Sequence, residues 1–599
     1  MFKGKYSWAA EALGGVLLFL LPLKFGALVS IPAITMIYWT DPVSLIVASW
    51  PGPVFPVLSA IFLLFSLLFV PGHIFSGKSG FFALLWIGLS LAAVAGIAAE
   101  GTPPDAWLYY LNHAFSIGAF LTGISHIVNH NRRICDVYYG IFTAAFCISL
   151  VIGLNQYFSG YETTIANIQE SRMGMVNDKI LARLQEMRVT GGFSACNAYA
   201  GYLVLGLPVA LGCLWKAGNK VSPPQISRIV FTVPVLTAGL FLLIKTGSRG
   251  GLLSLFSALF FLLFSAKMKW KYRFALLGMI PAGIAGLTAL VMLGRGGKSI
   301  LFRLDYLQGA FRMMLESPLN GMGWGGFQRQ FMKMKWILDA EAPASPHNFP
   351  LSFGSQCGIF GFLLACIILG MAFYVLFRHL SKGSLRENFE NSRLIGTLSF
   401  AGVCGWGIHS LQEVLYETPG AVIPFGVIVI LAFAQIPAAS QEDKMPSSEK
   451  KQILFLCLTL CYGVAALYLS GKTLLFDSSL AALNDMTDYR MIPKEKLILI
   501  NDSDVASVFE KARNFKPDSP FPYLSVSDFA AAKGDFGTAL SMTRKAAELD
   551  PFSSGYQQRL YKMLKYIGQE KEAEIHLRRA AELFPMNPDL QDLLKQEAR

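Results

Sequence analysis

The chain has 599 residues, of which 53% are hydrophobic and only 15% are charged. An ordinary soluble domain carries roughly 25% charged residues, so this composition excludes a soluble globular protein and indicates a chain largely surrounded by lipid. The formal net charge is +12, but Lys and Arg collect in short segments between apolar runs. Membrane topology explains this pattern better than a basic stripe for nucleic acid, so no nucleic-acid partner is expected.

Membrane helices are predicted from the N-terminus onward. Met1 to Trp8 precede an apolar run without a small-residue cleavage site, which predicts an uncleaved first helix. Runs that can cross a hydrocarbon core of roughly 30 Å recur from Ala9 to Ser470, so we expect an all-α polytopic bundle of about 12–13 spans. The predicted spans are residues 9–31, 53–71, 81–99, 107–127, 136–158, 198–215, 229–245, 250–266, 274–293, 355–377, 394–411, 419–436 and 453–470.

The interval 32–52 fits this pattern least well. It contains an apolar stretch that is interrupted by Asp41 and Pro42 and followed by Pro51. Such a stretch is expected to be interfacial or re-entrant.

The basic segments predict which side of the membrane each connection faces. The segment from Lys267 to Arg273 carries four cations in seven residues, and the positive-inside rule places it in the cytoplasm. Other basic segments fall on the same side if the spans alternate: 130–133, 216–228, 378–393 and 441–451. Three arginine-bearing segments then face outward: 160–197, 245–251 and 294–350.

The third outward segment, 294–350, holds seven cations against four anions. Loops of this length can cross the membrane regardless of their charge, so this excess of positive charge need not affect the topology. Cations gathered at a membrane surface also suit an anionic substrate.

Short motifs lie in all three outward segments. The first motif runs from Arg188 to Asn197, and the second runs from Thr246 to Gly251 around Arg249. The third begins near Arg303, continues through the glycine-rich residues 320–326, and ends at the pair His347 and Asn348, with Leu351 and Gly358 four and eleven residues after the histidine.

Taken together, these motifs resemble the O-antigen ligase and polymerase superfamily of bacterial polytopic glycosyltransferases, over roughly residues 188–417. The sequence departs from the family pattern at Cys196, where relatives often have proline, and at Gln356, near where many relatives carry glutamate. Neither departure removes an expected catalytic group.

The resemblance implies a multi-pass enzyme of the bacterial inner membrane. It would move a glycan from a polyprenyl-diphosphate carrier to an acceptor hydroxyl on lipid, glycan or protein at the outer face. A polymerase that uses the same type of donor is the closest alternative. A membrane transporter is the remote alternative, because the chain shows no internal duplication with broken helices.

Arginine suits the leaving diphosphate, because a guanidinium stays charged and binds phosphate oxygens in pairs. Arg249 and Arg303 are the leading candidates, followed by Arg188 and then Arg295. The alternative for each is anchoring at membrane lipid phosphates. Two further arginines are expected on solvated helix faces, namely Arg312 and Arg329.

Histidine suits the acceptor, because a neutral imidazole accepts a proton near neutral pH. His347 is therefore the predicted base or orienting group, and Asn348 and Asn197 are predicted to support the site. The alternative is that His347 only caps the following span. The outward-facing Glu413 and Glu417 are weaker candidates for binding the acceptor.

No metal or other cofactor is predicted. The outward segments contain no pair of aspartates that could hold a divalent cation on a diphosphate, so arginine would take that role. The nine cysteines lie mostly inside predicted spans and show no paired spacing, which argues against a zinc site or a disulfide framework.

The C-terminal residues predict a second domain. Pro517, Pro551 and Pro585 are 34 residues apart, as are Gly534 and Gly568, which is a tetratricopeptide-like period. Two alanine pairs share it, Ala539 with Ala573 and Ala546 with Ala580. We therefore expect a membrane domain over 1–470, a linker over 471–502, and an α-solenoid over 503–599 that lies outside the cytoplasm, beside the His347 loop. The concave surface of such a solenoid suits a protein partner, and the alternative is a module that only packs on the membrane domain.

Overall fold

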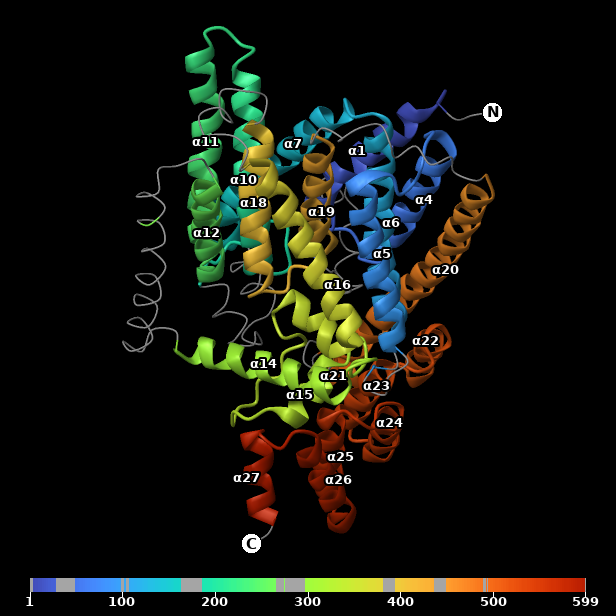
Figure 1. Cartoon of the computed structure of the whole chain (residues 1–599). Coiled ribbons are helices and arrows are strands. Elements are labelled where there is room, and N and C mark those ends of the chain that lie inside the picture. The colour runs from blue at the N-terminus through green and yellow to red at the C-terminus, as the bar shows by residue number, and fades with distance from the viewer. Residues whose placement is uncertain are drawn as a thin grey trace.

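The computed structural model describes residues 4–27, 49–97, 102–103, 107–162, 186–265, 274, 297–380, 394–435, 449–488, 492 and 494–597. Within these residues every regular element is a helix, as predicted (Figure 1). The first half of the chain contains α1 (Ser7–Lys24), α4 (Val54–Phe69), α5 (Gly77–Ile97), α6 (Trp107–His130), α7 (Ile134–Asn155), the π-helical turn η1 (Gln156–Gly160), α10 (Cys196–Gly218), α11 (Pro224–Lys245) and α12 (Arg249–Ser265).

The next part of the chain completes the bundle. It contains α14 (Gly297–Glu316), α15 (Phe327–Met334), α16 (Phe349–Leu380), α18 (Leu394–Ser410), α19 (Pro419–Ala434) and α20 (Glu449–Thr487). Seven of the described helices are long and apolar enough to cross a membrane, namely α1, α5, α7 with η1, α10, α11, α16 and α20, and α4, α12 and α19 are shorter apolar helices. The chain is thus a multi-pass membrane protein. The predicted span 274–293 and the interval 32–48 lie outside the described residues, and the other predicted spans coincide with helices.

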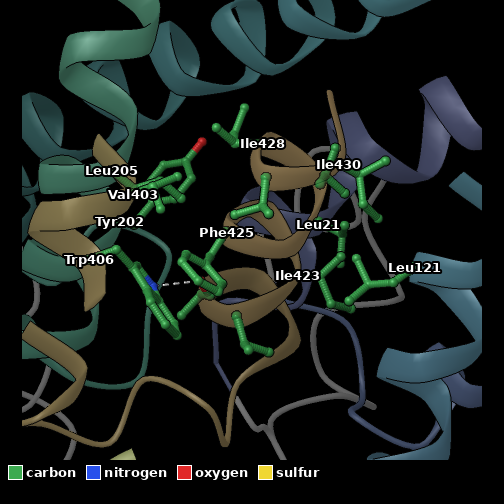
Figure 2. Close-up of a cluster of buried hydrophobic side chains, with 14 of the residues drawn as sticks. Leu21, Leu121, Tyr202, Leu205, Val403, Trp406, Ile423, Phe425, Ile428 and Ile430 are labelled. Carbon is green, nitrogen blue, oxygen red and sulfur yellow. Dashed lines mark hydrogen bonds between the residues drawn. The ribbon is translucent and has the colours of Figure 1, made fainter. Parts of the chain in front are cut away.

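Helix α19 forms the centre of the bundle. Every residue from Pro419 to Phe433 is buried, and Figure 2 shows its side chains among those of α1, α6, α10 and α18. Phe425 stacks on Trp406 with ring centroids 4.0 Å apart, and the Trp406 indole donates to the Ala421 carbonyl at 3.1 Å. In contrast, α11 and α20 bury little of their apolar surface, which identifies them as lipid-facing helices.

The segment 294–350, which was expected to be an outward loop, is largely helical where the structure describes it. Helix α14 intersperses its apolar residues with five charged ones, so its sequence is too polar to be recognised as a membrane element. Figure 1 shows α14 lying across the lower end of the bundle, opposite the α10–α11 connection at the upper end. The segments 216–228 and 294–350 therefore lie at opposite ends of the bundle, as the alternation of spans predicts.

Helix α16 begins at Phe349 and is kinked at Gly358, where φ is +75°. A Cβ atom at this position would lie only 2.3 Å from the carbonyl oxygen of Leu319. Glycine is required here because the chain leaving α14 crosses α16 at the kink, where Ile359 N donates to the Pro318 carbonyl at 2.7 Å.

Helix α20 runs without a break to Thr487, so the predicted boundary near residue 471 and the first half of the linker 471–502 lie inside it. The residues after Ser470 are more polar but include good helix formers such as Leu and Ala. Their composition therefore marks where the chain becomes less apolar and not where the helix ends.

The C-terminal region consists of α21 (Lys494–Leu497), α22 (Asp502–Phe515), α23 (Phe521–Lys533), α24 (Phe536–Leu549), α25 (Ser554–Tyr566), α26 (Glu570–Leu583) and α27 (Pro588–Glu597). Neighbouring helices pack in chain order. Gly534 caps the C-terminus of α23, and Gly568 lies two residues after the end of α25; their φ angles are +87° and +80°. The four alanines with the 34-residue spacing are buried. The tetratricopeptide-like class remains a prediction.

This C-terminal region packs against the chain between α14 and α16. Arg329 of α15 forms a buried ion pair with Asp550, and Asp339 N donates to the Met586 carbonyl at 2.9 Å. Met332 and Ala342 join the apolar cluster of α24 to α27. The C-terminal region therefore contacts the segment that leads to His347, and the predicted solvated position for Arg329 is wrong because this contact covers it.

Candidate functional site

Three side chains from distant parts of the sequence meet at the end of the bundle where α14 lies. Arg303 belongs to α14, His347 lies two residues before α16, and Glu413 lies between α18 and α19. One oxygen of the Glu413 carboxylate accepts from the Arg303 guanidinium, and the other lies 3.3 Å from His347 Nδ1. We refer to Arg303, His347 and Glu413 as the His347 cluster.

The surroundings of His347 fix the orientation of its ring. The ring stacks on Tyr306 of α14, with centroids 5.7 Å apart and an interplanar angle of 27°. The carboxylate favours the tautomer that carries its proton on Nδ1. Within the described part of the chain, Nε2 has no hydrogen-bond partner, and one third of the side chain is exposed, so Nε2 can accept a proton from a bound hydroxyl.

Glu413 is the most buried member of the cluster, with 6% of its side chain exposed. Burial alone would raise its pKa. The hydrogen bond with His347, followed by the charge of Arg303, outweighs burial, so the pKa of Glu413 lies below its ordinary value of 4.5. The carboxylate is therefore ionised at neutral pH and holds two groups that are cationic or can become cationic.

Glu417 lies four residues further along the same connection and behaves differently. Burial raises its pKa to about 7, although the charge of His347 acts in the opposite direction. This second carboxyl therefore titrates near neutral pH. The charge of His347 lowers the pKa of both glutamates, and Glu413 is the one that lies within hydrogen-bonding distance of its ring.

Asn348 rather than His347 caps α16. Its Oδ1 accepts from Leu351 N at 3.0 Å, and its Nδ2 donates to the Leu411 carbonyl at 3.1 Å. The first bond provides an acceptor for a backbone N–H group in the first turn of α16. The second bond links the start of α16 to the connection between α18 and α19 that carries Glu413. The His347 imidazole is thus free of the capping role that was its alternative explanation.

A second group of side chains surrounds Arg188. Its Nε donates to the Thr246 carbonyl at 2.9 Å, and one terminal nitrogen lies 3.4 Å from Asn197 Oδ1. A Cβ atom on Gly247 would lie only 2.8 Å from Arg188 Nε, and this glycine has φ of +64°. We refer to Arg188, Asn197 and Thr246 as the Arg188 cluster, and its bonds hold the turn before α12.

The turn held by the Arg188 cluster leads directly to Arg249, the first residue of α12. Arg249 is exposed and has no ion pair or hydrogen bond with the residues that the structure describes. The following residue, Gly250, lies against His409 and Gln412, and His409 Nε2 lies 3.0 Å from the Asn197 carbonyl. Both clusters and Arg249 therefore lie at the same end of the bundle. An arginine at a helix N-terminus is well suited to bind an anion.

The sequence indicated most, but not all, of this arrangement. Arg295 lies outside the described residues, and Arg312 is exposed on α14, as expected. The sequence did not identify Tyr306 as a residue of the site, although residues three positions apart, such as Arg303 and Tyr306, are neighbours on the surface of a helix. It also ranked Glu413 low, because nothing in the sequence shows that a residue 66 positions after His347 contacts it.

Gln356, one of the departures from the family pattern, has a structural role here. Its Oε1 accepts from Gly325 N at 2.8 Å, and its backbone carbonyl accepts from Gly323 N at 3.2 Å. The side chain thereby fastens the glycine-rich turn before α15 to α16. An amide can make these bonds as well as a carboxylate can.

A comparison with known families matches one part of the chain. Residues 234–366, less than a quarter of the chain, match the family model described as O-Antigen ligase. The matched segment contains Arg249, Arg303 and His347, whereas Arg188 and Glu413 lie outside it. No curated protein matches the chain significantly. Residues 234–366 are thus similar to the O-antigen ligase family, and the chain that contains them is a helical multi-pass membrane protein.

Proposed function

We propose that the protein is an O-antigen ligase-like glycosyltransferase. It moves a glycan from a polyprenyl-diphosphate carrier to an acceptor hydroxyl at the outer face of a bacterial inner membrane. The observation that carries this proposal is the His347 cluster, because it combines a proton acceptor, a buried carboxylate and an arginine. Two of its three members lie in the segment that matches the ligase family.

His347 acts on the acceptor. Its Nε2 takes the proton of the acceptor hydroxyl as the hydroxyl oxygen forms a bond to the anomeric carbon of the glycan. The bond between that carbon and the phosphate oxygen breaks, and polyprenyl diphosphate leaves with the electron pair. Glu413 holds the imidazole by Nδ1 and stabilises the imidazolium that forms.

Arginine acts on the donor. Arg303 bonds to Glu413 through one terminal nitrogen, so its other N–H groups are open to phosphate oxygens. Arg249 adds a second cation at the start of α12. Arg188 and Asn197 hold the turn that places Arg249, and Arg295 remains a further candidate ligand. In this scheme arginines neutralise the leaving group, so the reaction needs neither a metal nor another cofactor.

The acceptor is a hydroxyl on lipid, glycan or protein. The repeat region packs beside the segment that leads to His347, which suits a role in selecting an acceptor or a protein partner. Its location outside the cytoplasm predicts that protease added to spheroplasts releases it. Digestion only in inverted vesicles would place it in the cytoplasm instead.

Surface glycans of a strain that lacks the gene test the proposed reaction. We expect long glycan chains to accumulate on the polyprenyl carrier and to be missing from the acceptor, with rescue by the wild type and by His576→Ala, a histidine variant in α26 of the C-terminal region. Acceptors that carry single short units would favour a polymerase. Unchanged surface glycans and carrier lipids would contradict both functions.

A further inference from the structure

Helix α14 exposes an apolar face that no described part of the protein covers. Leu301, Leu304, Phe311 and Leu315 are between 50% and 62% exposed. Their spacing of three, seven and four residues places them on one side of a helix with 3.6 residues per turn. Large apolar groups gathered on one exposed face mark a surface that meets lipid or protein.

The other sides of α14 have different surroundings. Tyr306, Ala310 and Met313 are buried against α15 in a small apolar cluster. Arg312 and Glu316 are exposed and lie on the flank between the buried and the apolar faces. One helix therefore has a side for protein, a side for water and an apolar side. This pattern is typical of a helix that lies in the plane of a membrane interface.

The apolar face of α14 continues into a surface that faces lipid. The chain after α14 meets α16 at its kink, where Ile359 N donates to the Pro318 carbonyl at 2.7 Å. Leu319 is 65% exposed, and Phe360 and Leu363 on the membrane-spanning part of α16 are 62% and 47% exposed. The apolar segment of α16 that can cross the bilayer runs from Phe349 to Phe377, so the end of α14 lies beside a membrane-spanning helix.

We propose that α14 is an interfacial helix whose apolar face, formed by Leu301, Leu304, Phe311 and Leu315, lies in the outer surface of the bilayer. Figure 1 shows the helix lying across the end of the bundle, as this position requires. Arg303 precedes Leu304 and lies at the border between the lipid side and the protein side. A consequence that rests on the proposed function is that a diphosphate attached to a lipid reaches Arg303 directly from the membrane.

Fluorescence quenching in nanodiscs tests the proposal on the full-length protein. A genetically encoded fluorescent amino acid is placed at Leu304 or Leu315, at Arg312 as the water-facing control on the same helix, and at Leu363 as the lipid-facing control. The nanodiscs contain phosphatidylethanolamine and phosphatidylglycerol, with brominated or ordinary acyl chains. Acrylamide serves as the quencher in water, and two test positions keep the experiment valid if one substitution disrupts folding.

We expect brominated lipid to quench the probes at 304 and 315 at least about threefold more than the probe at 312, and to a similar extent as the probe at 363. Quenching of 304 and 315 by acrylamide alone would mean that the face meets water. Quenching by neither agent would mean that protein covers it, and either result overturns the proposal. Because the readout is not activity, glycan transfer by the same preparations tests the proposed function separately.

Discussion

The two clusters at the end of the bundle are held together by different kinds of bond. In the Arg188 cluster, the guanidinium bonds to a backbone carbonyl and to a side-chain amide, next to a glycine that leaves room for it. In the His347 cluster, every bond joins two side chains that are charged or can become charged. Backbone bonds fix a turn in place, whereas a carboxylate can exchange one cationic partner for another as a substrate binds. We therefore assign chemistry to the His347 cluster and support to the Arg188 cluster.

The largest expected effect follows from removing the imidazole. His347→Ala should lower the rate of glycan transfer by about 10²- to 10⁴-fold, the usual contribution of a general base. Thermal unfolding should change little, because Asn348 and not His347 caps α16. Turnover in membrane vesicles and the melting temperature of the purified variant measure the two effects. Transfer at the wild-type rate would remove His347 from the mechanism.

Conservative lysine variants separate the two clusters. Arg303→Lys keeps the charge but loses the planar pairing with phosphate, so we expect transfer to fall by about 10- to 100-fold, the value of one or two charge-assisted hydrogen bonds. Arg312→Lys on the same helix is the matched control and should be silent.

Arg188→Lys should instead lower the melting temperature, because lysine cannot make both bonds of the Arg188 cluster at once. The free energy of unfolding should fall by about 1–3 kcal/mol, and turnover should fall less than it does with Arg303→Lys. If Arg188→Lys reduced turnover as strongly as Arg303→Lys at an unchanged melting temperature, the division between support and chemistry would be wrong.

The pH dependence of transfer tests the role of the Glu413 carboxylate, where a smaller effect is expected. Because the pKa of Glu413 is lowered, its bonds to Arg303 and His347 are fully present above the ordinary glutamate range, and they are lost only as the pH falls through its lowered value. Glu413→Gln keeps the shape but removes the charge, so transfer should fall by about tenfold. Transfer by the wild type should fall as the pH drops through the lowered pKa of Glu413, and Glu413→Gln should lose this part of the pH dependence because it has no carboxyl to protonate.

Glu316→Gln, an exposed glutamate on α14, is the matched control and should leave the pH profile unchanged. A Glu413→Gln profile that lies below that of the wild type by the same factor at every pH would point to a purely structural role for Glu413.

The smallest effect on transfer is expected at the contact with the repeat region. Arg329→Ala removes the buried ion pair with Asp550, which should weaken this contact by about 3–5 kcal/mol. Proteolysis should then release the repeat region faster, while transfer to an unselective acceptor stays near the wild-type rate. Arg544→Ala removes an exposed ion pair of the same region and serves as the control. A large loss of transfer with Arg329→Ala would mean that the repeats help to position the His347 cluster.

The sequence predicted the apolar helices that the structure describes, because an apolar run long enough to cross a membrane has few other uses. It was less informative where helices are amphipathic or continue into polar sequence, as in α14 and the second half of α20. Arg303 and His347 were recognised from short motifs. Their joint contact with Glu413 was not, because it brings together residues 110 and 66 positions apart. Such contacts depend on how α14, α16 and α18 pack, which local patterns do not encode.

Purified protein with a defined donor offers the most direct measurement. The wild type, reconstituted with a glycan on a polyprenyl diphosphate and a hydroxyl acceptor, is followed by mass spectrometry of the product and of released polyprenyl diphosphate in excess chelator. We predict stoichiometric formation of both products by the wild type, and formation of both that is slower by about 10²- to 10⁴-fold with His347→Ala. Activity that stops in chelator and returns with magnesium, or product formation that does not depend on His347, would contradict a metal-independent transfer by the His347 cluster.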